Sequence, residues 1–146
     1  MSDISKPHEV VRRLQEAIWY PPHPPRTETE LYRQSRRQLI EVEKQTCYIC
    51  GSGDKLESHH RFLEWALSDS CDFAKMKAAH PDFDSWDKVV PGDESTYFHF
   101  IDSTYNLLIL CEQHHRGPYG VHMITEPAWF AQRVITEEYL EKESDQ

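Results

Sequence analysis

Two pairs of metal-binding side chains, far apart in the chain, constrain its fold more than any other feature of the sequence. The first pair is Cys47-Tyr-Ile-Cys50 and the second is Cys111-Glu-Gln-His114. Three thiolates and one imidazole at these spacings make a complete ligand set for a closed, tetrahedral zinc site. Gly51 and Gly53 follow the first pair and allow the backbone to curl around an ion. The sequence therefore predicts a structural zinc ion that joins two distant segments.

Cysteines at these positions have two alternative uses, disulfide bonds and redox chemistry. Four cysteines could form two disulfides, and a CxxC pair can also be a thioredoxin-like redox motif. The redox motif needs a βαβ setting that the flanking sequence does not supply. Nine histidines accompany the cysteines, and in a reducing compartment this favours metal over disulfides. Cys71 is left over, and a lone cysteine is more often a small buried hydrophobe than a ligand.

A second set of polar residues surrounds the zinc ligands. His59 and His60 are adjacent in a segment that we expect to be extended, so their side chains should point to opposite sides. Asn106 precedes the apolar run Leu107 to Leu110, which is short enough for a buried strand. His115 directly follows the last zinc ligand. Each of these residues is weak evidence alone, but their order along the chain is informative.

In that order the residues resemble the pattern of the HNH endonucleases, also called His-Me-finger or ββα-metal proteins. That pattern is a CxxC knuckle, an acid or histidine followed by His, an Asn that opens a strand, a second knuckle and a final His, which here is His122. The match covers about residues 46 to 123. The resemblance implies an α+β, mainly helical fold, in which a ββα-metal core is stapled by one structural zinc and flanked by N-terminal helices and a C-terminal helix.

The resemblance also implies a role for each matched residue. The structural zinc ligands would be Cys47, Cys50, Cys111 and His114, with His114 in place of the family's usual fourth cysteine. His60 would be the general base that takes a proton from the attacking water, and Asn106 would brace the loop that presents it. His59 and His115 would bind the catalytic metal, and His122 would be a third ligand or a phosphate contact. Arg116 is the nearest candidate for a phosphate clamp.

Phosphodiester hydrolysis needs an activated water, neutralised phosphate charge and a stabilised leaving oxygen. A histidine with an ordinary pKa of ~6.5 suits the first task. One divalent ion can serve the other two, and the ligand types leave Mg²⁺, Mn²⁺, Ni²⁺ and Zn²⁺ open.

The chain length of 146 residues predicts a single domain, 1–146, with three parts. Residues 1–45 form an N-terminal helical arm with a proline-rich turn, 46–123 the HNH and zinc module with an acidic insertion at 62–105, and 124–146 a C-terminal helix with an acidic tail. Helical spacing predicts a helix over about 7–19. A Thr27–Glu30 capping box predicts a second helix that continues to about Lys44.

The insertion and the C-terminal part have further expected elements. In the insertion we expect helical pieces around Phe62 to Ala66 and Phe73 to Ala79, and a short strand from Tyr97 to Ile101. Its aromatic residues are expected to form core rather than a base-stacking platform. Pro127 opens the C-terminal helix, whose apolar residues should pack over the zinc module; they are Trp129, Phe130, Val134 and Leu140.

Charge is distributed unevenly along the chain. The whole chain has a net charge of −9, whereas most proteins that coat nucleic acid are basic. Residues 1–61 hold ten basic and nine acidic residues, net +1; the insertion holds three and nine, net −6. A nucleic-acid partner should therefore contact the first part of the chain. Arg33, Arg36 and Arg37 form either a solvated face with Glu partners or a phosphate-contacting face.

Two functions from different classes follow from these observations. The first is a metal-dependent HNH endonuclease that acts on nucleic acid, with DNA as the expected substrate. The second is a catalytically silent HNH-fold zinc module that binds a protein through its acidic insertion or mimics nucleic-acid charge, as in a phage or mobile element. No apolar run approaches ~20 residues, so we expect no membrane span and a cytoplasmic location. The N-terminal helices could pair two chains, but covering one face of the module is the favoured arrangement.

Overall fold

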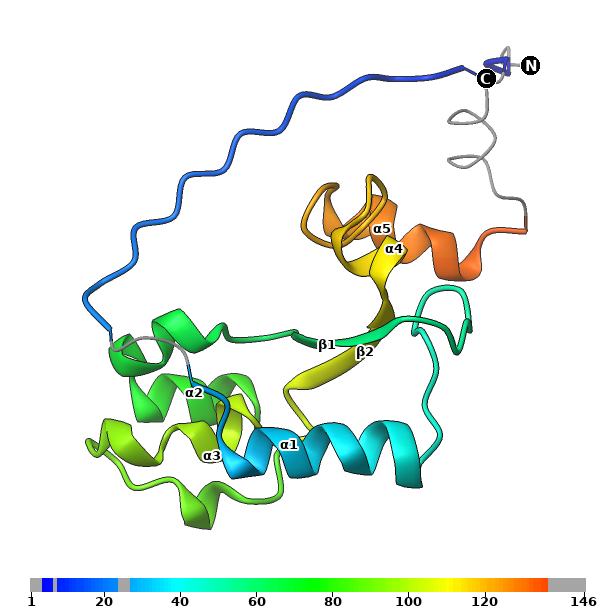
Figure 1. Cartoon of the computed structure of the whole chain (residues 1–146). Coiled ribbons are helices and arrows are strands. Elements are labelled where there is room, and N and C mark those ends of the chain that lie inside the picture. The colour runs from blue at the N-terminus through cyan, green and yellow to red at the C-terminus, as the bar shows by residue number, and fades with distance from the viewer. Residues whose placement is uncertain (1–3, 7, 24–26, 137–146) are drawn as a thin grey trace.

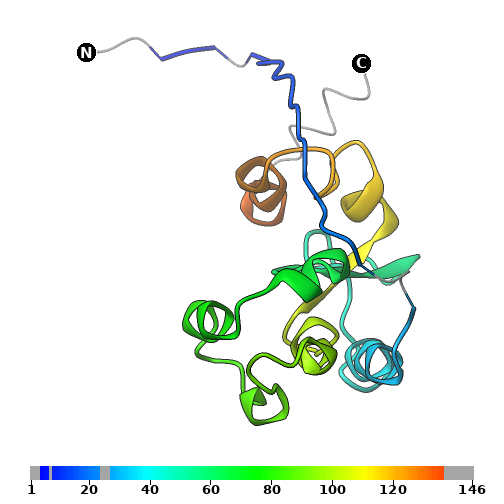
Figure 2. The same cartoon turned by 90° about the vertical axis from the view of Figure 1, so that its left-hand side faces the viewer.

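A two-stranded antiparallel sheet lies at the centre of the fold, between two groups of helices (Figure 1). The computed structural model describes residues 4–6, 8–23 and 27–136. Strand β1 (Leu56–His60) pairs with β2 (Leu107–Cys111) in a register that sets Leu56 opposite Cys111 and His60 opposite Leu107. Helices α4 and α5 lie on one side of the sheet and α1, α2 and α3 on the other, as both views show (Figures 1 and 2). The expected α+β class is confirmed.

The helical elements follow one another in short pieces. Their bounds are α1 (Glu30–Arg37), which continues into a π-helical turn η1 (Gln38–Val42), the 3₁₀ turn η2 (Trp65–Ser70), α2 (Phe73–Ala79), the 3₁₀ turns η3 (Trp86–Lys88) and η4 (Glu94–Thr96), α3 (Phe98–Ile101), α4 (Glu112–Arg116) and α5 (Glu126–Val134). Among the described residues, no helix is both long and apolar enough to cross a membrane.

Strand β2 organises two separate parts of the core. All five of its residues are buried, as the apolar run predicted. Because successive side chains of a strand point to opposite faces, Leu108 and Leu110 pack with the cysteine knuckle and Trp129, while Leu107 and Ile109 pack with α1. The strand therefore joins the cysteine knuckle to the N-terminal helix.

The acidic insertion has a hydrophobic core of its own. Seven buried residues form it: Met76, Phe83, Trp86, Val89, Tyr97, Phe100 and Ile101. The helical piece expected from Phe73 to Ala79 is confirmed as α2, whereas the one expected around Phe62 to Ala66 lies further along the chain as η2. The aromatic residues form core, as predicted. The strand expected from Tyr97 to Ile101 is wrong. Tyr97, Phe100 and Ile101 are all buried, and this i, i+3, i+4 spacing is that of a helix face, which α3 forms.

The N-terminal part differs from expectation in two ways. The helix predicted over 7–19 is wrong for the described residues 8–19, which have no regular secondary structure. Val10, Val11 and Leu14 are exposed, and an isolated segment of this length does not stay helical without a surface to bury its apolar face. The second helix begins later than the capping box predicted, because Thr29 and not Thr27 is its N-cap.

The C-terminal helix covers the cysteine knuckle as expected, but it does so through Trp129, and the packing predicted for Phe130 and Val134 is wrong because both side chains are exposed. Pro127 lies in the first turn of α5, and Trp129 is 4% exposed against Cys47 and Cys111. The Trp129 indole donates a hydrogen bond to the His114 carbonyl oxygen at 2.9 Å, which ties α5 to α4. Leu140 and the expected acidic tail, Glu137 to Asp145, lie outside the described residues.

Candidate functional site

The four predicted zinc ligands converge at one end of the sheet. Their ligand atoms all lie within 4.8 Å of one another. A zinc ion with Zn–S distances of ~2.3 Å and Zn–N distances of ~2.0 Å has ligand–ligand edges of roughly 3.5–3.8 Å in tetrahedral geometry. Cys50 and Cys111 Sγ are 3.8 Å apart, and His114 Nδ1 is 4.0 Å from Cys47 Sγ and 3.3 Å from Cys111 Sγ. The cysteines of the cluster are not joined by a disulfide, and the cluster can hold a metal ion such as zinc.

Local structure explains how the knuckle presents its ligands. Gly51 has a φ of 77°, a conformation that favours glycine, and its N–H donates to the Cys47 carbonyl oxygen at 2.9 Å. Burial raises the pKa of the Cys111 thiol to about 11. Burial also opposes ionisation of Cys47, but hydrogen bonds from backbone N–H groups outweigh it and lower the pKa of that thiol. Metal binding must therefore displace a proton, above all from Cys111.

A second cluster of metal-binding side chains lies between β1 and α4, and its three members are histidines. His59, His115 and His122 each offer a ring nitrogen within 4.8 Å of the others, and the Nε2 atoms of His115 and His122 are 3.1 Å apart. Burial lowers the pKa of His59 to about 3, with the neighbouring His115 and His122 as further causes. Burial also lowers the pKa of His122. Near pH 7 both rings are neutral, which is the form that binds a metal ion.

Glu57 connects this cluster to Arg116. Its Oε1 is 2.7 Å from His115 Nδ1, and Arg116 donates to both of its oxygens, from Nε at 2.9 Å and from Nη2 at 2.5 Å. The Arg116 hydrogen bond is the main cause that lowers the pKa of Glu57 to about 2. A carboxylate can only accept hydrogen bonds, so the proton of the neutral His115 ring is on Nδ1, which donates to Glu57. The other ring nitrogen, Nε2, then carries a lone pair and faces His122. A carboxylate behind a histidine in this way is the usual support of a metal ligand.

The turn between His115 and His122 brings the two histidines together. Gly117 and Gly120 fit tightly against α4, since a Cβ on Gly120 would lie 2.6 Å from the His115 carbonyl oxygen. The Val121 N–H donates to the His114 carbonyl oxygen at 3.0 Å. The segment Gly117-Pro-Tyr-Gly120 therefore folds back on the helix, and His122 lies beside His115.

His60 points to the other side of β1 from His59, as expected for adjacent residues of a strand. Its Nε2 is 3.0 Å from Asp102 Oδ1, and its side chain is 10% exposed. The Tyr32 ring stacks against the imidazole with ring centroids 5.8 Å apart. His60 is thus held between α1 and the end of α3.

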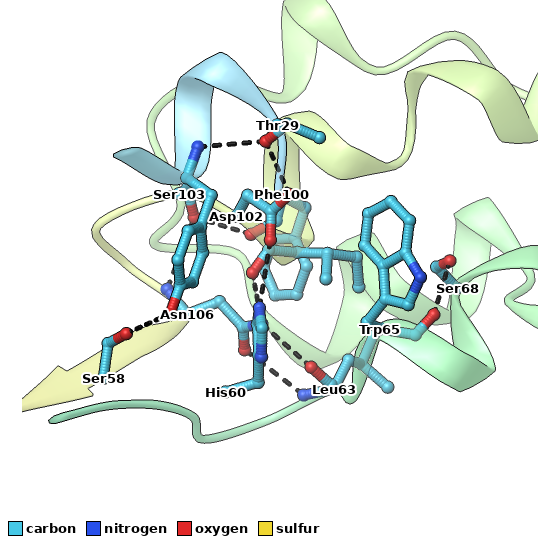
Figure 3. Close-up of polar contacts among 12 residues, drawn as sticks. Thr29, Ser58, His60, Leu63, Trp65, Ser68, Phe100, Asp102, Ser103 and Asn106 are labelled. Carbon is cyan, nitrogen blue, oxygen red and sulfur yellow. Dashed lines mark hydrogen bonds and ion pairs between the residues drawn. The ribbon is translucent and has the colours of Figure 1, made fainter. Parts of the chain in front are cut away.

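Asn106 fixes the segment that follows His60. Its Oδ1 accepts hydrogen bonds from the Phe62 and Leu63 N–H groups at 3.0 and 3.2 Å, and its Nδ2 donates to the Leu63 and Ile101 carbonyl oxygens at 3.0 and 2.7 Å. The Asn106 side chain itself is fully buried, and Figure 3 shows it beside Leu63. The amide therefore ties the end of β1 to the end of α3.

Replacing Asn106 by alanine is expected to lower the free energy of unfolding by about 3–5 kcal/mol. The substitution leaves several buried backbone groups without a partner, and each such group costs about 1–3 kcal/mol. Urea unfolding followed by circular dichroism measures the change. Ser103→Ala is the matched control, because that buried hydroxyl donates to the Phe100 carbonyl oxygen and accepts only from the Asn106 N–H, which keeps a second partner in the Ser103 carbonyl oxygen. We expect a loss of only about 1 kcal/mol in the free energy of unfolding. If both variants lose the same free energy of unfolding, Asn106 does not brace the segment that follows His60.

One cavity connects the histidine cluster with His60. It has a volume of about 460 Å³, and its walls include His59, His60, His115 and His122. The N-terminal segment contributes Glu16, Ile18, Tyr20 and His23 to the same walls. The Tyr20 hydroxyl donates to Glu64 Oε2 at 2.6 Å, a contact between this segment and the rim of the cavity. The structure thus places four predicted site histidines around one space.

Sequence reasoning missed two carboxylates of this site. Glu57 lies two residues before His59 in β1, so the alternation of a strand already places both side chains on one face. Asp102 lies 42 residues after His60 within the acidic insertion, and no spacing rule relates the two. Cys71 lies outside both clusters, half-buried against the core of the insertion, as expected.

Comparison of the chain with models of protein families, with curated proteins and with solved structures finds no match.

Proposed function

We propose that this protein is a metal-dependent endonuclease of the HNH type, with His60 as its general base. The observation that carries the proposal is the shared cavity. It brings a buried histidine with a carboxylate partner together with three imidazoles that can bind a metal ion. Phosphodiester hydrolysis by this mechanism requires a general base next to a divalent-metal site. The proposal includes a structural zinc in the Cys47, Cys50, Cys111 and His114 cluster.

The chain's residues divide the chemistry between them. His60 takes the proton of the attacking water, and its partner Asp102 stabilises the resulting imidazolium. A divalent ion held by His59, His115 and His122 would neutralise phosphate charge and stabilise the leaving oxygen. Glu57 supports His115 and also pairs with Arg116, the residue that the sequence suggested as a phosphate clamp. Arg116 would therefore contact phosphate only in competition with Glu57.

The donor atoms of the second cluster suit some ions better than others. The three ligands in this cluster are imidazoles, which bind Zn²⁺, Ni²⁺ and Mn²⁺ more readily than Mg²⁺, an ion that prefers oxygen. Of the four ions considered from the sequence, the proposal therefore favours the transition metals. Mg²⁺ would be bound mainly through water and substrate oxygens.

A second groove supports nucleic acid as the substrate. It has a volume of about 770 Å³ and runs between α1 and β1. Its charged wall residues are four arginines and three glutamates: Arg33, Arg36, Arg37, Arg116, Glu28, Glu41 and Glu57. Ser58 and His115 line both this groove and the histidine cavity, so the two spaces adjoin. Arg33 and Arg37 pair with Glu30 and Glu41 only at exposed positions, where such pairs contribute little and leave the cations available to phosphate.

Cleavage of supercoiled plasmid tests the proposal. The purified protein is incubated with plasmid and Mn²⁺, Ni²⁺, Zn²⁺ or Mg²⁺, beside His60→Ala and a control, His99→Ala, which replaces a histidine outside the cavity. We expect relaxed or linear product from the wild type and from His99→Ala, and a rate at least about 100-fold lower from His60→Ala. If the wild type gives no product with any of the four metal ions, the proposed nuclease activity is wrong and a catalytically silent binding module is favoured.

A further inference from the structure

We propose that Asp102 is a positioning residue that holds His60 in one tautomer, with the proton on Nε2 and the lone pair on Nδ1. The acidic insertion, which the sequence suggested would repel a polyanion, would thus supply an essential part of the site. The catalytic consequence rests on the proposed function. The tautomer itself does not, because it follows from the contacts of the two side chains.

The surroundings of Asp102 explain the assignment. Its side chain is 3% exposed, and burial of a carboxylate is costly unless hydrogen bonds satisfy its oxygens. Oδ2 accepts from the Thr29 hydroxyl at 2.8 Å, and Oδ1 is 3.0 Å from His60 Nε2 (Figure 3). A carboxylate has no proton to donate, so the hydrogen between Oδ1 and Nε2 belongs to the imidazole. In neutral His60, Nδ1 is then the nitrogen that accepts a proton.

The backbone on both sides holds this pair in place. Asp102 is the C-cap of α3, and its N–H donates to the Phe98 carbonyl oxygen at 2.8 Å. Asn106 bonds to the carbonyl oxygen of Ile101, next to Asp102, and to the two N–H groups that follow Arg61. One buried amide therefore joins the element that carries the base to the element that carries its partner, so neither side chain can move away without breaking buried hydrogen bonds.

A purely structural role is the alternative to be excluded. Asp102 also anchors Thr29, the N-cap of α1, and could serve only to fix that helix. Thr29→Val removes this anchor but leaves the His60 contact, whereas Asp102→Ala removes both. Asp102→Asn keeps an oxygen that can accept from Nε2–H and an amide that can donate to Thr29, so the shape and the tautomer are retained while the charge is lost.

The test combines ¹⁵N NMR of the histidine rings with plasmid cleavage. His60 signals are assigned by their loss in His60→Ala, and two-bond ¹H–¹⁵N couplings distinguish the two neutral tautomers. We expect Nε2–H in the wild type, in Thr29→Val and in Asp102→Asn, and a mixture in Asp102→Ala. Cleavage should fall about 10- to 100-fold in Asp102→Ala, through kcat rather than KM, and less in Thr29→Val.

Each outcome bears on the proposal. Nδ1–H in wild-type His60 overturns it without any variant, even if Asp102→Ala does not fold. An unchanged tautomer in folded Asp102→Ala overturns it as well, and so does a loss of cleavage in Thr29→Val that equals the loss in Asp102→Ala. If the protein cleaves nothing but His60 is the Nε2–H tautomer, the proposed function fails while the assignment of Asp102 as the orienting partner stands.

Discussion

Replacing Cys50 by serine is expected to unfold the protein, although Cys50 is the one exposed member of its cluster. A substitution at an exposed position ordinarily changes stability by about 0.5 kcal/mol or less. If the cluster holds zinc, however, the change removes a metal ligand, and structural zinc contributes about 10–16 kcal/mol in small sites, as much as the whole stability of a typical domain. Circular dichroism and metal analysis of the purified variant measure the outcome.

Cys71→Ser is the matched control for this prediction. Cys71 is half-buried and outside the cluster, so on packing alone its substitution should cost more than that of Cys50. The zinc account predicts the reverse order, with a folded, zinc-loaded Cys71→Ser protein and an unfolded Cys50→Ser protein. A folded Cys50→Ser protein that lacks zinc would show that the cluster is not a structural metal site.

Replacing His115 by alanine is expected to reduce cleavage to the uncatalysed background and to leave the fold intact. His115 is the member of the histidine cluster that Glu57 supports, and its Nε2 lies 3.1 Å from His122 Nε2. In the proposed function, its loss would remove a ligand of the catalytic ion but no ligand of the structural zinc. Calorimetric titration with Mn²⁺ or Ni²⁺ should show the binding event of the wild type disappear, while one zinc per chain remains.

Glu57→Gln provides a graded comparison for the same site. The amide keeps the shape of the carboxylate but loses its charge, and changes of this kind behind a metal ligand typically cost 10- to 100-fold in affinity or activity. We therefore expect an intermediate effect between wild type and His115→Ala. Normal metal binding and cleavage by His115→Ala would show that the three-histidine cluster is not the catalytic metal site.

The parts of the fold that could be predicted are those fixed by local pattern. The cysteine spacing predicted which segments meet, and the apolar run before Cys111 predicted a buried strand. The alternation of side chains in a strand predicted that His59 and His60 serve different partners, and the same rule applied to Glu57 would have found the support of His115.

The parts that could not be predicted depend on long-range contacts. The residues at 8–19 have helical spacing, but spacing predicts a helix only where a surface covers its apolar face, and Val10, Val11 and Leu14 are exposed. Asp102 reaches His60 only because the insertion folds around its own aromatic core and returns the chain at Asn106. A charge count of the insertion could not distinguish this one buried carboxylate from its exposed neighbours.

Counting bound metal ions while measuring cleavage tests the central claim, that one metal site holds the fold and another performs the chemistry. Native mass spectrometry of mildly chelated protein, titrated with Mn²⁺, gives the occupancy of each site, and plasmid cleavage is measured on the same samples. We predict one zinc per chain that resists mild chelation and a cleavage rate proportional to occupancy by a second ion. Cleavage without the second ion, or none when both sites are full, would contradict the account.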